Sequence, residues 1–161
     1  MNKFAKPVVL LVALISLALL AVGLYMQLVL DMLPCPLCIL QRYAFALTAL
    51  LCLLTIALPT NYLRAGAAAA SLASITGAGI AIRHLWVKAH PTISCGIDAL
   101  EVALNKLVFA NWLPALFQAD GLCTTEYEPI LGLSIPAWAL IWFSGFALTM
   151  SLIALRYRRP A

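Results

Sequence analysis

The fold of this 161-residue chain is decided by the stretch PVVLLVALISLALLAVGLYMQLVL (residues 7–30), DMLPCPLC (residues 31–38) and ILQRYAFALTALLCLLTIAL (residues 39–58). A helix crosses the ~30 Å hydrocarbon core of a bilayer with about 20 apolar residues, so both outer segments are long enough to span it. Pro34 and Pro36 keep the joining segment from continuing as a helix. We therefore expect two membrane spans joined by a short turn that holds Cys35 and Cys38 at the membrane surface.

Two further apolar segments, residues 65–82 and 135–155, extend the same pattern toward the C-terminus. The chain is 65% hydrophobic and 10% charged, and its mean hydropathy is +1.03. A water-soluble core of this size cannot bury so much apolar surface. The first segment is longer than the apolar part of a secretory signal and has no small-residue cleavage pattern after it, so we interpret it as a retained span. The sequence predicts an all-α membrane protein in which residues 1–161 form a single four-helix transmembrane domain.

The charges are divided between the two ends of this predicted bundle. The N-terminus, the connection after residue 58 and the C-terminus carry the basic residues Lys3, Lys6, Arg64, Arg156, Arg158 and Arg159. The other connections carry the acidic residues Asp31, Asp98, Glu101, Asp120, Glu126 and Glu128. By the positive-inside rule, both termini are expected to be cytoplasmic, with the loops 31–38 and 84–133 on the opposite side. The net charge of +4 is thus a topology signal, and we see no nucleic-acid-binding patch in it.

The connection 84–133 is far longer than most connections between helices, and such loops are usually functional or disordered. Apolar residues recur in it at helical spacing: Ile97, Leu100, Leu104 and Val108. This pattern predicts a short amphipathic helix that lies on the membrane. A second apolar cluster follows at Trp112, Leu113, Leu116 and Phe117.

A Cys-x-x-Cys pair alone is compatible with a redox dithiol, half a zinc site or a structural disulfide. Cys38 stands at the start of a predicted helix, where the helix dipole favours an anion, and Arg42 follows four residues later on the same face. Both features stabilise the reactive thiolate, so Cys38 is expected to carry the negative charge. Disulfides persist in oxidising compartments, which in a bacterial inner membrane places these thiols on the periplasmic side. Cys52 lies deep in the second span and is interpreted as a small apolar core residue.

Three further positions have two interpretations each. Arg42 either extends to the lipid headgroups or, with the neighbouring Gln41, forms a polar pocket that stabilises an anionic state of an electron acceptor. We expect it to lie away from the long loop. His84, at the end of the third span, is either an interfacial hydrogen-bonding residue or part of that pocket. Cys95 and Cys123 are either a static crosslink of the long loop or partners of Cys35 and Cys38 in sequential thiol–disulfide exchange. For the exchange, we expect the long loop to offer both cysteines to a soluble protein.

Five motifs along the chain resemble those of the bacterial disulfide bond formation protein B (DsbB) family. They are PCPLCILQR (residues 34–42), RHLW (83–86), SCG (94–96), GLC (121–123) and LGLSIPAW (131–138). The resemblance spans essentially the whole chain, in order. It implies a membrane thiol oxidase that re-oxidises the soluble periplasmic protein DsbA and passes the electrons to ubiquinone or menaquinone.

The resemblance also implies roles for individual residues. Cys95 would be attacked by the DsbA thiolate, and Cys123 would pass the electrons to Cys35. Cys38 would face the quinone with Arg42 as its electrostatic partner, and His84 would be a further quinone contact. The implied disulfides are Cys35–Cys38 and Cys95–Cys123, and no metal is implied.

Two alternatives remain at this point. The vitamin K epoxide reductase-like proteins also combine a four-helix bundle, a Cys-x-x-Cys pair, loop cysteines and a quinone. Their loop pair comes before the Cys-x-x-Cys pair, whereas here Cys35 and Cys38 come first. The other alternative is a non-enzymatic membrane protein in which four cysteines bind a metal.

Overall fold

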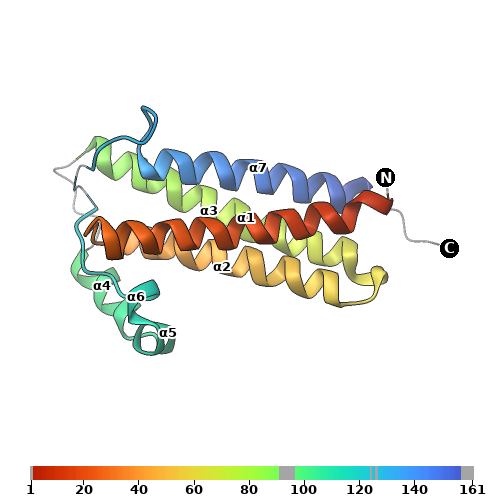
Figure 1. Cartoon of the computed structure of the whole chain (residues 1–161), viewed down its shortest axis with the longest axis horizontal. Helices are drawn as coiled ribbons and strands as arrows, with labels where there is room; N and C mark the ends of the chain where they lie inside the picture. The colour runs from red at the N-terminus through yellow and green to blue at the C-terminus, as the bar shows by residue number, and fades with distance from the viewer. Residues whose placement is uncertain (1, 91–96, 124, 126, 157–161) are drawn as a thin grey trace.

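Four long helices run side by side along the molecule in the computed structural model, which describes residues 2–90, 97–123, 125 and 127–156 (Figure 1). They are α1 (Asn2–Val29), α2 (Pro36–Ala57), α3 (Leu63–Ala89) and α7 (Ile135–Arg156). A 3-10 turn, Thr60–Tyr62, joins α2 to α3. All four are long and apolar enough to cross a membrane. The described residues contain no β-strand, and the predicted all-α membrane fold is confirmed.

Helix α3 is longer than the sequence predicted. We expected a span over residues 65–82 followed by a loop from His84, but the helix continues to Ala89. The prediction was wrong there because a helix satisfies its backbone hydrogen bonds whether or not its side chains are apolar, so hydropathy falls before the helix ends. As a consequence, His84 is held on a rigid helix rather than on the loop.

The four long helices pack in sequence order: α1 packs on α2, α2 on α3, and α3 on α7. The first and last of them, α1 and α7, touch little. Small residues let α7 approach α3 closely, as at Gly77, where a β-carbon would collide with the ring of Phe143. That ring is fully buried and stacks on Phe45 at 3.9 Å. The loose contact between α1 and α7 leaves room for a cavity, described below.

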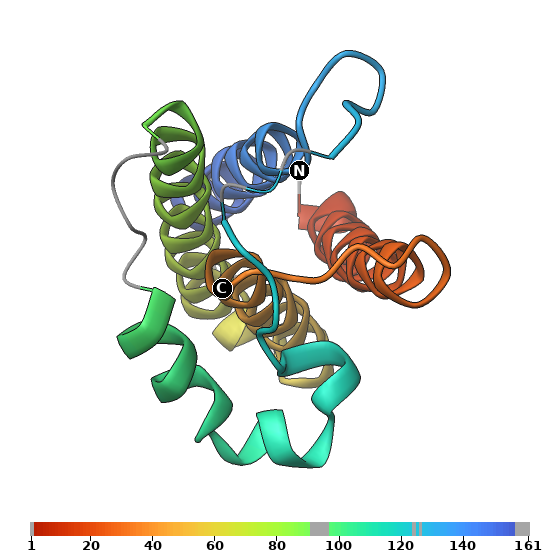
Figure 2. The ribbon, with the colours of Figure 1, turned by 90° about the vertical axis from the view of Figure 1, so that its left-hand side faces the viewer.

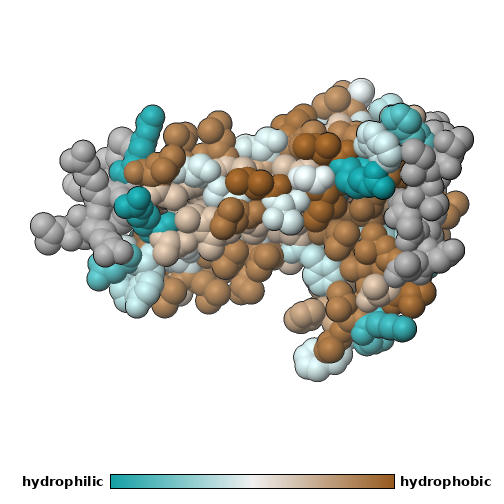
Figure 3. Space-filling view, turned by 180° about the vertical axis from the view of Figure 1, so that it is seen from behind, coloured by the Kyte–Doolittle hydropathy of each residue, from teal (hydrophilic) through white to brown (hydrophobic). Residues whose placement is uncertain are grey.

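The surface of the bundle has the polarity of a membrane-spanning protein. Figure 3 shows apolar side chains over the middle of the molecule and hydrophilic ones mainly toward its two ends. Helix α1 begins and α7 ends at one end, and the connection between α1 and α2 lies at the other (Figure 1). This arrangement is consistent with the predicted order of spans.

In the described part of the long connection, three short helices follow α3 where we expected one: α4 (Ile97–Asn105), α5 (Val108–Trp112) and α6 (Pro114–Phe117). They lie beside α2 at the end of the bundle that also holds the connection between α1 and α2 (Figure 2). The ring of Phe117 in α6 stacks on the ring of Tyr43 in α2, with their centroids 4.4 Å apart. Residues 91–96 lie outside the described part of the chain, and Cys95 is among them.

Candidate functional site

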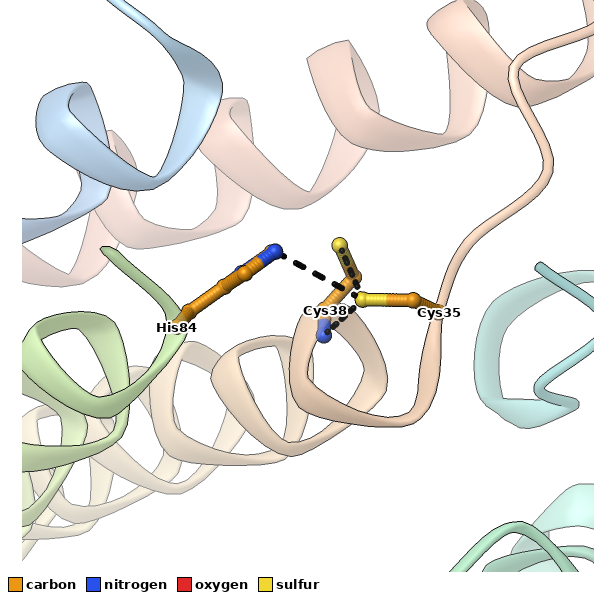
Figure 4. Close-up of side chains that lie close together, drawn as sticks. All are labelled: Cys35, Cys38 and His84. Carbon is orange, nitrogen blue, oxygen red and sulfur yellow. Dashed lines mark hydrogen bonds between the residues drawn. The ribbon is translucent and has the colours of Figure 1, made fainter. Parts of the chain in front are cut away.

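The Cys-x-x-Cys pair forms the start of α2. Pro36 occupies the first helical turn, where its missing N–H is not needed, and Cys35 caps the helix. The Cys35 Sγ accepts the backbone N–H of Cys38 at 3.3 Å and lies 3.1 Å from the Cys38 Sγ, to which it donates (Figure 4). The two thiols therefore face each other at a helix N-terminus, where negative charge on Cys38 is stabilised by the helix dipole.

Cys123 is brought to this pair by hydrogen bonds between two loops. The backbone N–H groups of Asp120 and Gly121 both donate to the carbonyl of Pro34 at 3.1 Å. The hydroxyl of Tyr127 donates to the carbonyl of Leu33 at 3.1 Å. Cys123 is consequently buried in one cluster with Cys35, although we expected the long loop to offer it to a soluble protein.

The Cys35 thiol lies between the other two thiols. Hydrogen bonds with Cys123 and with Cys38, together with burial, raise the pKa of Cys35 above its ordinary value. Cys35 thus keeps its proton and shares it with a neighbouring sulfur. This agrees with the sequence-based expectation that the negative charge of the reduced pair is carried by Cys38.

His84 reaches the same place from α3. Its Nε2 lies 3.7 Å from the Cys35 Sγ, and its Nδ1 lies 3.3 Å from the side-chain nitrogen of Gln41 (Figure 4 shows the first contact). His84 and Gln41 are only 4% and 5% exposed. The structure therefore places His84 against the thiols, one of the two environments that its sequence position allowed.

Arg42 is buried, with 9% of its surface exposed, and its guanidinium donates to four neutral oxygens. Two belong to α1, the Gln27 side-chain oxygen at 2.7 Å and the Gly23 carbonyl at 2.9 Å. The other two are the carbonyls of Ala115 and Leu116 in α6, at 3.4 and 3.1 Å. The expectation that Arg42 lies away from the long loop is therefore wrong. Because these acceptors are uncharged, the guanidinium retains a positive charge that attracts an anion.

A cavity of about 280 Å³ joins these residues. Its walls are mostly apolar and include the aromatic side chains of Phe45, Trp138 and Trp142. Its polar lining includes Cys35, Cys38, Cys123, Gln41, Arg42, His84 and Lys88. An apolar pocket with a few convergent polar groups is typical of a small-molecule site, and this volume suits one planar ring.

Of the six candidate residues chosen from sequence, five line this one cavity, and Cys95 lies outside the described residues. Cys52 is fully buried in a different apolar cluster. Gln27 was missed, although an amide in an otherwise apolar span is a recognisable signal. The carbonyl partners of Arg42 could not be found, because every residue has a backbone carbonyl.

The ligand atoms of Cys35, Cys38 and His84 all lie within 4.8 Å of one another. Two thiols and an imidazole are the donor types that zinc prefers. The geometry thus has two chemical uses, dithiol exchange and binding of a soft metal.

Taken together, the fold and the site define a multi-pass membrane protein that carries its thiols at one end of a four-helix bundle, beside an apolar cavity with a buried cation. Comparison with known proteins identifies the class more narrowly. The family described as "Disulfide bond formation protein DsbB" matches residues 5–153. The chain belongs to the DsbB family of membrane disulfide bond formation proteins, as its sequence motifs suggested.

Individual relatives agree with this assignment. A "Disulfide bond formation protein B" of Herminiimonas arsenicoxydans is 59% identical over 154 residues, which cover 96% of this chain and 98% of the relative. "Disulfide bond formation protein B 1" of Pseudomonas syringae pv. syringae is 43% identical over 96% of this chain and 92% of its own. A "Disulfide bond formation protein B" of Burkholderia pseudomallei is 43% identical over 95% and 91%. The vitamin K epoxide reductase-like alternative is therefore set aside.

Proposed function

We propose that this protein is an inner-membrane thiol:quinone oxidoreductase that re-oxidises a DsbA-type periplasmic protein and passes the electrons to ubiquinone or menaquinone. The observation that carries the proposal is the position of the Cys35–Cys38 pair. One side of the pair meets Cys123 on the loop, and the other opens on the apolar cavity with its buried Arg42. A cysteine pair in this position can exchange disulfide bonds with a loop cysteine, and it can pass electrons to a ring-shaped acceptor in the cavity.

The relay follows from thiol–disulfide exchange, in which a thiolate attacks one sulfur of a disulfide and the other sulfur leaves with the electron pair. A DsbA thiolate attacks Cys95 of the Cys95–Cys123 disulfide, and Cys123 leaves as a thiolate. Cys123 then attacks Cys35 of the Cys35–Cys38 disulfide, and Cys38 leaves as a thiolate. The second DsbA thiol closes the DsbA disulfide and frees Cys95, which attacks Cys123 and releases Cys35.

The cavity residues fit a quinone. Phe45, Trp138 and Trp142 offer apolar faces to a ring, and Arg42 would hold negative charge that develops on it. A bound quinone would accept the two electrons and two protons released when the Cys35–Cys38 disulfide forms again. The chain's own residues would bind and orient the quinone and would exclude water from the exchange.

The proposal is tested by mixing the purified protein with reduced DsbA and a soluble quinone. We expect quinone absorbance to fall while DsbA loses two thiols for each quinone reduced, and we expect neither change when the protein is omitted. Loss of DsbA thiols without quinone reduction, or no loss at all, contradicts the proposal.

The proposed orientation predicts a labelling pattern in a chain whose five natural cysteines are replaced. Leu131→Cys, at a position that is 87% exposed in the connection before α7, should react with a membrane-impermeant thiol reagent on intact spheroplasts. Asn61→Cys, in the exposed turn between α2 and α3, should react only after lysis. The reverse pattern would show that the termini are periplasmic.

Gly121→Ala is expected to slow DsbA oxidation by about ten- to hundredfold, since misplacing a reacting group by about 1 Å has effects of that size. A β-carbon at Gly121 would collide with the backbone carbonyl of Leu33 and thus move Cys123 away from Cys35. The KM for quinone should stay unchanged. Gly79→Ala is the control, because a β-carbon there meets nothing within 4 Å. A Gly121→Ala rate equal to that of Gly79→Ala contradicts the proposed path through Cys123.

Metal binding is the second candidate function, favoured by the close approach of Cys35, Cys38 and His84. Zinc coordination would block the thiols and leave no role for a quinone. Elemental analysis of protein purified without chelators separates the two. About one tightly bound zinc per chain, together with no oxidase activity, supports the metal site, and zinc-free active protein rules it out.

A further inference from the structure

A chain of hydrogen bonds runs from Gln41 to Cys38 through His84 and Cys35. The Gln41 Nε2 lies 3.3 Å from His84 Nδ1, His84 Nε2 lies 3.7 Å from Cys35 Sγ, and Cys35 Sγ donates to Cys38 Sγ at 3.1 Å. The first three members are each 5% exposed or less. Water therefore competes little for these contacts. A further partner is Cys123, whose backbone interacts with His84 and whose side chain interacts with Cys35.

The chemistry of the members fixes the direction of the chain. An amide nitrogen only donates, so His84 Nδ1 must accept and cannot carry the proton. A neutral imidazole then has its proton on Nε2, the atom that faces Cys35. The Cys35 sulfur then accepts hydrogen bonds from the Nε2–H of His84 and from the backbone N–H of Cys38. It donates its own proton to the Cys38 sulfur. Along the side chains, the donors of this chain thus point from Gln41 toward the Cys38 sulfur. The backbone of Cys123 competes for the ring proton of His84, and the Cys123 sulfur competes for the proton of Cys35.

We propose that Gln41 is a positioning residue that fixes the tautomer of His84 and so directs this chain of hydrogen bonds onto the thiolate of Cys38. Aligned hydrogen bonds polarise one another, so the donor at the far end strengthens the last bond, from Cys35 to Cys38. Loss of the Cys38 proton to solvent then leaves a sulfur whose negative charge is stabilised from two sides, by Cys35 and by Arg42. This role deepens the proposed oxidase function and rests on it.

The titratable groups around the Cys38 thiol are known, which makes a measurement of its reactivity against pH interpretable. Those that line the same cavity are Cys35, Cys123, Arg42, His84, Lys88 and Tyr127. They come from the first connection, α2, α3 and the loop before α7. A Gln41→Leu substitution changes none of them, so a change in the pH profile reports the hydrogen-bond chain itself.

The tautomer can be measured directly, because the chain has only two histidines. In ¹⁵N-histidine-labelled reduced protein, we expect the His84 ring to carry its proton on Nε2. His90 is the internal control of opposite sign, since its Nδ1 lies 3.0 Å from the Trp86 carbonyl and must donate to it. A spectrum in which His84 carries its proton on Nδ1 would mean that the Gln41 amide is turned around, and it overturns the proposal without any mutation.

The effect on Cys38 is measured by the rate of iodoacetamide alkylation of the reduced protein against pH, with the modified site mapped by mass spectrometry. Gln41→Leu should slow Cys38 alkylation at pH 7 by about three- to tenfold and move the profile to higher pH, the size expected for one hydrogen bond. Gln118→Leu makes the same chemical change at an exposed glutamine and should leave the rate unchanged. Equal rates for the two variants contradict the role of Gln41. Neither measurement uses DsbA or a quinone, so a failure here is distinct from a failure of the proposed oxidase reaction.

Discussion

Replacement of Cys38 by alanine is expected to reduce quinone-dependent DsbA oxidation by about a thousandfold or more, the size of effect seen when a nucleophile is removed. The same loss is expected for Cys35→Ala, Cys95→Ala and Cys123→Ala, because the proposed relay passes through all four sulfurs and offers no second route. The measurement is the steady-state rate of quinone reduction with reduced DsbA.

Cys52→Ala is the matched control for these four variants. Cys52 is fully buried in the apolar core that joins α2 to its neighbours, and among the described thiols that core does not include Cys35, Cys38 or Cys123. Its replacement should leave the rate within about twofold of the original, because a small apolar filler is exchanged for another. A Cys52→Ala loss as deep as the other four would show that the set of reacting thiols is wrongly assigned.

The second large effect is expected at Arg42. Arg42→Ala should raise the KM for quinone by about ten- to hundredfold, which corresponds to the loss of one hydrogen bond to a charged group. The pattern of a raised KM with a smaller change in kcat is that of lost binding. Lys should restore activity only in part, since it keeps the charge but lacks the planar fork. Unchanged quinone kinetics would reduce Arg42 to a structural residue.

The contacts of Arg42 with α6 add a second expectation. Ala115 and Leu116 lose their shared donor in Arg42→Ala, so the KM for DsbA should change as well, by less than that for quinone. Gln27→Leu is the control, because it removes one acceptor and keeps the charge. Its effect on quinone KM should be clearly smaller than that of Arg42→Ala. Equal effects would assign the role to the hydrogen bonds rather than to the charge.

The four spans and the turn with Cys35 and Cys38 could be predicted because both depend on local chemistry: apolar length, proline and the preference of a helix start for an anion. The end of α3 could not, since Trp86 and Lys88 are compatible with a helix or a loop at a membrane surface. The boundaries of the three short helices α4 to α6 could not be predicted from the sequence either. Their apolar residues repeat at helical spacing across positions where the backbone turns.

The site was predicted as a set of residues and not as an arrangement. Cys35, Cys38 and Arg42 lie within eight positions of one another in sequence, so helical spacing alone relates them. The burial of Cys123 depends on the carbonyl of Pro34, and that of Arg42 on carbonyls in α6. A sequence does not show which backbone carbonyls will accept these hydrogen bonds. The pairing of Cys95 with Cys123 stays a prediction.

The hydrogen bonds that join Asp120 and Gly121 to Pro34 have a kinetic consequence for the proposed relay. They hold Cys123 in contact with Cys35, so that its effective molarity there far exceeds the roughly millimolar value of a short flexible tether. A dissolved thiol at millimolar concentration competes poorly with such a neighbour. It must also reach a Cys35 side chain that is only 2% exposed. The inner dithiol is thereby insulated from small thiols in the surroundings, and selectivity for the protein donor is set by which sulfur can make contact at all.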